Sequence, residues 1–132
     1  MKKLRFACSL VVLSACLPAS LTGQAGQETA AVKEQIEQGQ QALKAGKYKD
    51  AIEFLKKANA SQGNYCGECY LLMAVAYYKS GKLSESVENS DRAVAVASDD
   101  KMRATAHSLK GNALFAAAGK DSKKMGGAEV EF

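Results

Sequence analysis

The sequence predicts an all-α fold of stacked helical hairpins, and three observations lead to it. The only proline among the 132 residues is Pro18, tryptophan is absent and alanine is abundant, a composition that favours helices and excludes a β-sandwich. Apolar residues recur at intervals of three and four from Ala30 onward, which is the period of one helix face. Gly46, Gly81 and Gly119 follow one another at intervals of 35 and 38 residues, which indicates a helical repeat.

Residues 1–25 have the three zones of a secretory signal peptide. Met1–Arg5 is cationic, Phe6–Leu21 is mostly apolar, and Thr22–Ala25 is small and polar. The apolar stretch of about sixteen residues is shorter than the roughly 20 residues that a membrane span needs. We therefore expect the chain to be exported to the periplasm or cell envelope.

Two cleavage sites fit this leader equally well. Leu13-Ser14-Ala15-Cys16 resembles a bacterial lipobox, in which case residues 1–15 are removed and Cys16 is acylated. Cleavage after Ala25 would instead release the protein, with residues 26–29 as a linker. Contact with a membrane is expected only through a lipid on Cys16.

The net charge of +4 comes mostly from the leader. Lys2, Lys3 and Arg5 lie there, and without residues 1–25 the chain has 15 basic and 14 acidic residues. Such a balance predicts no phosphate-binding surface, so a nucleic-acid partner is not expected.

The pattern after the linker predicts a first helical hairpin. Its first helix carries an apolar stripe of Val32, Ile36, Gly39 and Leu43. Gly46 ends this helix, because glycine readily takes the positive φ that follows a last turn. The inward face of the second helix contains Ala51, Ile52, Leu55 and Ala58. The loop at 61–65 ends the hairpin.

The same pattern then repeats. A third helix has the stripe Leu72, Met73, Ala76 and Tyr77 and ends at Gly81, and a fourth has Val87, Ala93, Val94 and Ala97. Ser98-Asp99-Asp100 is expected to cap a fifth helix from Lys101 to about Ala118, with an inward stripe of Met102, Ala106, Leu109 and Ala113. Gly119 is expected to end that helix, and residues 119–127 to form a long loop or a delayed start of a sixth.

These hairpins resemble tetratricopeptide repeats, whose unit of about 34 residues has the signature W-x2-L-G-x2-Y, A-x3-F and P. In the second copy the slots are filled by Tyr70, Met73, Ala74 and Tyr77. Gly39 and Gly111 supply the small residue of the first and third copies, where paired helices should approach closely. His107 falls in the tryptophan slot of the third copy, which favours a packed side chain, and residues 128–132 fit A-x3-F.

The resemblance implies a right-handed solenoid over residues 30–132, with full repeats at about 32–65 and 66–99 and a partial third at 100–132. The first helix of each hairpin would line a concave face that binds an extended peptide or a partner helix. That face would contain Gln40, Leu43, Lys44, Leu71, Val75, Tyr78, Lys79, Ser108, Asn112 and Phe115. Helical spacing alone favours the core over a binding site for Tyr78 and Phe115.

Two details qualify this resemblance. Ile36 and Leu109 stand where family members that grip a C-terminal carboxylate have polar residues, so that type of ligand is not expected. No polar helix caps the third repeat before Phe132, although solenoid ends normally have one. The sequence thus suggests a fragment of a longer protein, or a homodimer that hides the uncapped repeat.

Cys66-Gly67-Glu68-Cys69 is the motif with the most specific chemistry. It is expected at the start of the third helix, where the dipole favours a thiolate as in redox C-x-x-C sites. The oxidising environment of an exported chain favours a structural disulfide instead. A redox pair usually lies in a thioredoxin-like βαβ unit, and the sequence indicates no strands. Free thiols are the third possibility.

No other constellation points to catalysis, a metal or a cofactor. A zinc site needs about four ligands, whereas Cys66, Cys69 and the sole histidine, His107, are the only cysteine and histidine candidates in residues 30–132. Tyr70 stands where haem attachment requires histidine, and no phosphate-binding loop or nucleophile motif is present. The sequence therefore predicts a non-catalytic scaffold for protein–protein contacts in the bacterial envelope. The alternative is the N-terminal repeat segment of a longer envelope enzyme, which could handle thiols.

Overall fold

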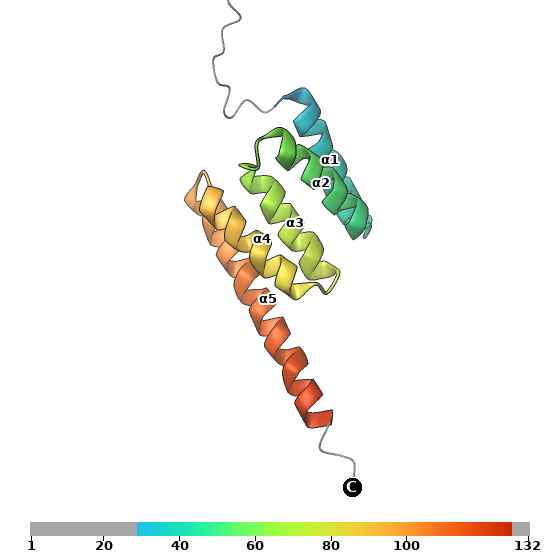
Figure 1. Cartoon of the computed structure of the whole chain (residues 1–132), viewed down its shortest axis with the longest axis vertical. Helices are drawn as coiled ribbons and strands as arrows, with labels where there is room; N and C mark the ends of the chain where they lie inside the picture. Colours follow the sequence, from blue (N-terminus) through green and yellow to red (C-terminus); the bar gives the residue numbers. More distant parts are fainter. Residues whose placement is uncertain (1–28, 128–132) are drawn as a thin grey trace, which may run out of the picture.

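The computed structural model describes residues 29–127, and the side chains of residues 29–122. The proposed leader and lipobox and the A-x3-F match at 128–132 lie outside this range. Within it the chain forms five helices: α1 (Ala30–Lys44), α2 (Tyr48–Ser61), α3 (Gly67–Lys79), α4 (Leu83–Val96) and α5 (Asp100–Gly127) (Figure 1). The predicted all-α class is confirmed.

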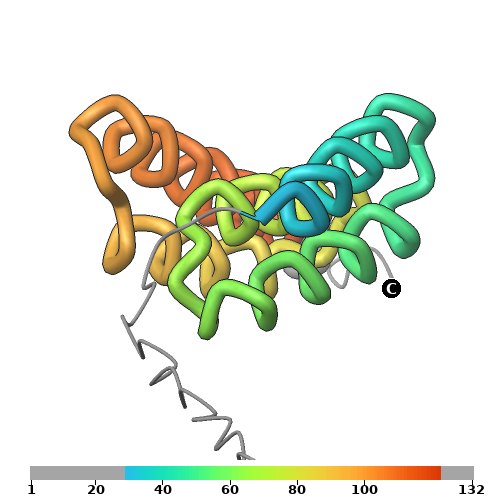
Figure 2. The backbone as a smooth tube through the Cα atoms, turned by 90° about the horizontal axis from the view of Figure 1, so that it is seen from above, coloured from blue at the N-terminus to red at the C-terminus, as the bar shows by residue number. Residues whose placement is uncertain are grey.

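Consecutive helices pack side by side as hairpins. α1 packs on α2, α3 on α4, and α4 on α5, while α2 and α3 join the first hairpin to the second. Figure 2 shows α1 and α5 as the two raised sides of a V, with α3 between them. The concave face is therefore formed by α1, α3 and α5, and α2 and α4 lie behind it, as the tetratricopeptide resemblance implies.

Glycine turns end the first helix of each of the first two hairpins. Gly46 has φ 75° and Gly81 has φ 78°, a region that other residues rarely adopt. The amide of Lys47 then donates to the carbonyl of Ala42 at 2.9 Å, and the amide of Lys82 donates to the carbonyl of Tyr77 at 2.9 Å. These bonds satisfy carbonyls that the helix ends would otherwise leave unpaired.

The core consists of two adjoining clusters. One contains Val32, Ile36, Ala58, Cys66 and Cys69, and the other contains Leu55, Tyr70, Met73, Ala93 and Ala106. Gly39 lies where α1 and α2 approach closely enough to leave no room for a side chain, because a Cβ built on it would be 2.8 Å from Leu55 Cγ. Inside the second hairpin, the buried Ser86 hydroxyl donates to the carbonyl of Ala74 at 2.9 Å. Small residues thus allow close helix approach in both hairpins, as predicted.

The predicted end of the fifth helix is wrong. α5 continues through Gly119 to Gly127, and its C-terminal half extends past the rest of the molecule (Figure 1). Gly46 and Gly81 are followed by segments whose apolar residues pack back on the preceding helix, whereas Gly119 is followed by Lys120, Asp121 and Ser122. None of these three residues has an apolar side chain that could pack back on α5, and Gly119 keeps a helical conformation.

Three expectations for the same helix are also wrong. His107 is exposed rather than packed, Phe115 is 83% exposed rather than in the core, and Gly111 has no atom within 4 Å of a Cβ built on it. All three lie away from α4, on a side of α5 that no other helix within residues 29–127 covers. These positions of the repeat signature are interior only where a following helix packs against them.

Candidate functional site

The first part of the concave face is a hollow of about 400 Å³ between α1 and α3. Its lining is Gln40, Leu43, Lys44, Gly46, Tyr48, Leu72, Val75 and Lys79. Leu43, Leu72 and Val75 are only partly buried. Lys44 and Lys79, in the last turns of α1 and α3, border the hollow with exposed side chains.

A second hollow of about 460 Å³ lies between α3 and α5. It is lined by Val75, Ala104, Thr105, Ser108, Leu109 and Asn112. Val75 borders both hollows, so the concave face is continuous from α1 across α3 to α5. Hydroxyl and amide groups on α5 can pair with a peptide main chain, and the apolar residues can contact its side chains.

The structure brings most of the predicted binding residues to these hollows. Gln40, Lys44, Val75 and Lys79 line the first, together with Leu43, and Ser108 and Asn112 line the second. Leu71 instead packs against the second core cluster, and Tyr78 is half-buried. Phe115 lies further along α5 and is the most exposed large apolar side chain among the described residues.

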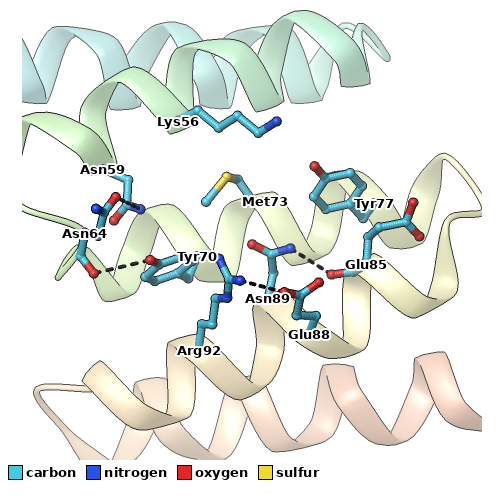
Figure 3. A pocket seen from close by; sticks show the side chains of 10 residues that line it. All are labelled: Lys56, Asn59, Asn64, Tyr70, Met73, Tyr77, Glu85, Glu88, Asn89 and Arg92. Atoms are coloured by element: carbon cyan, nitrogen blue, oxygen red, sulfur yellow. Dashed lines mark hydrogen bonds and ion pairs between the residues drawn. The ribbon is translucent and has the colours of Figure 1, made fainter.

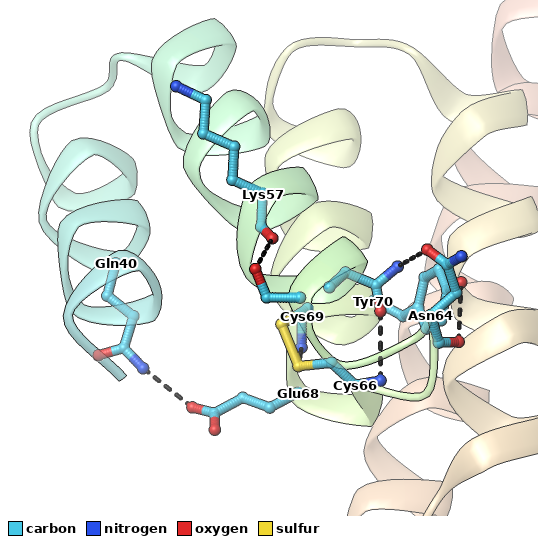
Figure 4. Close-up of a disulfide and its surroundings, with 9 residues drawn as sticks. Gln40, Lys57, Asn64, Cys66, Glu68, Cys69 and Tyr70 are labelled. Carbon is cyan, nitrogen blue, oxygen red and sulfur yellow. Dashed lines mark hydrogen bonds between the residues drawn. A yellow bond between two sulfur atoms is a disulfide. The ribbon is translucent and has the colours of Figure 1, made fainter. Parts of the chain in front are cut away.

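One hydrogen bond crosses between the first helices of the two hairpins. Gln40 Nε2 donates to Glu68 Oε1 at 3.0 Å, from α1 to the first turn of α3 (Figure 4). Glu68 is about 16 Å along α3 from Lys79, at a helix rise of 1.5 Å per residue. The concave side of α3 therefore has an acidic end at Glu68 and a basic end at Lys79.

Cys66 and Cys69 form a disulfide at the start of α3 (Figure 4). Cys66 is the N-cap residue, and its sulfur accepts from the Cys69 amide at 3.0 Å. Their exposed fractions are 4% and 0%, and they pack with Val32, Ile36 and Ala58. Redox-active cysteines are partly exposed, so this burial favours the structural interpretation of the motif.

Asn59 supports the loop that carries the disulfide, a role that the sequence analysis missed. Its buried Oδ1 accepts from the Cys66 amide at 3.2 Å, and its Nδ2 donates to Asn64 Oδ1 at 3.2 Å. Asn64 itself has a positive φ of 65°. An asparagine pair around the glycine of a loop is the signal that could have indicated this, since asparagine tolerates such a turn.

A third hollow, also missed, lies on the opposite side of the layer between α2 and α4 (Figure 3). Its volume is about 570 Å³, and Tyr70, Met73 and Tyr77 of α3 form its floor. Arg92 lies over the Tyr70 ring, 5.9 Å from its centroid, and pairs with Glu88 at 2.6 Å. The Tyr70 hydroxyl donates to the carbonyl of Asn64 at 3.3 Å. The Arg92–Glu88 and Tyr70–Asn64 pairs lie in this hollow, and Lys56 and Glu85 add one further charge of each sign to its lining.

Two features are absent from the part of the chain that the structure describes. No three His, Cys, Asp or Glu side chains in it are grouped as metal ligands would be. None of its helices combines the length and apolar character that crossing a bilayer requires.

Five helices in consecutive hairpins, with a concave face formed by the first helix of each, define a tetratricopeptide-type repeat protein. Within that class the chain belongs to the YfiO family of outer membrane lipoproteins, whose family model matches residues 28–126. No curated protein and no solved structure matches the chain. Family membership shows that the protein is exported and belongs to the cell envelope.

Proposed function

We propose that the protein is a lipid-anchored scaffold that binds an extended segment or a helix of another envelope protein on its concave face. The observation that carries this proposal is the continuity of the two hollows through Val75, from α1 to α5. A surface of partly exposed apolar side chains flanked by lysine, hydroxyl and amide groups suits peptide recognition. Phe115, exposed on the same long helix, extends the apolar surface beyond the hollows.

Cys16 is the proposed site of the lipid. The two cleavage sites fit the leader equally, and membership of a lipoprotein family favours Leu13-Ser14-Ala15-Cys16. An acylated Cys16 would hold the repeat domain at the membrane surface, and the short distance along the chain to α1 would keep the concave face near that surface. The intact mass of the exported protein tests this. Processing at the lipobox removes residues 1–15 and adds the mass of the lipid, whereas cleavage after Ala25 leaves an unmodified chain beginning at Gly26.

Site-specific photocrosslinking in cells tests the binding surface. A photoreactive residue at Ser108, exposed in the second hollow, should crosslink to a defined partner protein. The matched control is Ala95, which is also exposed but lies on α4, behind the concave face. Equal crosslinking at both positions, or a partner at Ala95 alone, would contradict the proposal.

A further inference from the structure

The hollow between α1 and α3 has an unusual charge composition. Two lysines, Lys44 and Lys79, border it, and no carboxylate is among its lining residues. Within residues 29–122, neither lysine forms an ion pair, which holds for every lysine there except Lys110. The other described hollows differ: the one between α3 and α5 has no charged lining residue, and the one between α2 and α4 has two basic and two acidic residues.

The helix dipole explains part of this arrangement. A lysine in the last turn of α1 or α3 complements the partial negative charge of a helix C-terminus. That effect needs only a basic residue in the turn, on any side of the helix. It does not require both lysines to border one hollow whose walls include the apolar residues Leu43, Leu72 and Val75. Two free cations beside an apolar floor match a ligand that carries carboxylates next to apolar side chains.

The continuity of the concave face favours an internal segment over a chain terminus. Past Val75 the second hollow offers Thr105, Ser108 and Asn112, which suit the main chain of a segment that continues across α5. Neighbouring helices lie about 8–10 Å apart, so the path from α1 to α5 is roughly 20 Å. An extended chain covers that path with about six residues at 3.3 Å each.

We propose that the concave face binds an extended internal segment of a partner protein, whose acidic side chains pair with Lys44 and Lys79 while its apolar side chains enter the hollow beside Val75. This inference rests on the proposed function and specifies the chemistry of the partner. The acidic residues lie at the α1 end of the bound segment, and polar, uncharged residues lie at the α5 end. Glu68 lies in the first turn of α3, where it accepts a hydrogen bond from Gln40. Its negative charge disfavours acidic residues of the ligand near that end of α3.

Fluorescence anisotropy with the full-length protein in detergent tests the charge preference. The probes are three peptides of eight residues, acetylated and amidated, that share their leucines and serines and carry two Glu, two Gln or two Lys. The Glu peptide should bind about tenfold more tightly than the Gln peptide, since two exposed ion pairs each contribute a few-fold in affinity. The Lys peptide should bind more weakly than both. Raising the salt to about 0.5 M should largely remove the difference between Glu and Gln.

Two double variants assign the preference to the hollow. Lys44→Gln with Lys79→Gln should abolish the tenfold difference. The control, Lys49→Gln with Lys57→Gln, changes the net charge equally at two exposed positions of α2 and should leave the difference intact. If the control pair removes the preference as well, the effect is one of total charge and the inference is wrong.

A fourth probe separates side-chain carboxylates from a terminal one. The Gln peptide with a free C-terminal carboxylate should bind no more tightly than its amidated form. If this probe and the amidated Glu peptide bind with equal affinity, the inference that the ligand is an internal segment is wrong. If Ser108 crosslinks a partner but the Glu, Gln and Lys peptides bind alike or not at all, the inference fails and the proposed function stands. If Ser108 crosslinks nothing, the function itself fails.

Discussion

Replacing Gly39 by alanine should destabilise the protein, although the same change elsewhere in a helix normally stabilises it. Gly39 is buried in α1, and a Cβ at this position would lie 2.8 Å from Cγ and 2.9 Å from Cδ2 of Leu55. Both distances are shorter than a normal van der Waals contact. Leu55 cannot move aside easily, because its side chain is fully buried in the second core cluster. Gly111 of α5 is the matched control, since a Cβ there meets nothing within 4 Å.

The expected magnitudes follow from two opposing effects. Overpacking a core costs about 1–3 kcal/mol, and alanine gains about 1 kcal/mol over glycine in a helix interior. The free energy of unfolding should therefore fall by roughly 1 kcal/mol for Gly39→Ala, and by up to about 2 kcal/mol if Leu55 is forced from its rotamer. Gly111→Ala lacks the overpacking term and should stabilise by about 0.5–1 kcal/mol.

Urea unfolding followed by helical circular dichroism measures both changes. In a domain of this size a loss of 1 kcal/mol corresponds to roughly 4–8 °C in Tm. Leu55→Ala alone should cost about 3–5 kcal/mol, and adding Gly39→Ala to it should cost nothing further, because the new Cβ then occupies space that the leucine has left. Two results would refute the reasoning: Gly39→Ala as stabilising as Gly111→Ala, or costs that simply add in the double variant.

Three further predictions concern the disulfide, its supporting loop and the exposed end of the surface. Replacing Cys66 and Cys69 together by serine should lower the unfolding free energy by about 1–2 kcal/mol for the short closed loop and by roughly a further 1 kcal/mol or more for the two buried hydroxyls, and reduction should not change the variant's unfolding curve. Asn59→Ala leaves the buried Cys66 amide without a partner and should cost about 1–3 kcal/mol in the same assay, whereas exposed Ser84→Ala should change it by less than about 0.5 kcal/mol. Phe115→Ser should leave stability within about 0.5 kcal/mol of wild type, because the ring is exposed, and should weaken crosslinking from Ser108. A large loss of stability in this last variant would show that Phe115 is packed.

Much of the fold could be predicted because its determinants are local. The apolar stripes of α1 and α2 became buried faces, because residues three and four apart lie on the same side of a helix. Asp99 caps α5 by accepting from the Met102 amide at 2.7 Å, a short-range bond visible as an acid before a helical pattern. The candidate surface could also be located on α1 and α3, because both hairpins that form it are complete within residues 29–127.

The rest depended on which neighbour each residue meets. Gly119 has the same backbone freedom as Gly46 and Gly81, and it remains helical because the polar residues after it have no core to pack against. Gly67 belongs to a cysteine motif in the sequence, yet a Cβ there would lie 2.7 Å from Met102 Sδ, so its size governs the approach of α5 to α3. The sequence alone determined where helices form and which faces are apolar, since those follow from residue type and period. Only the tertiary structure decided whether such a face is covered, because burial requires a second surface and its position is not encoded in the helix itself.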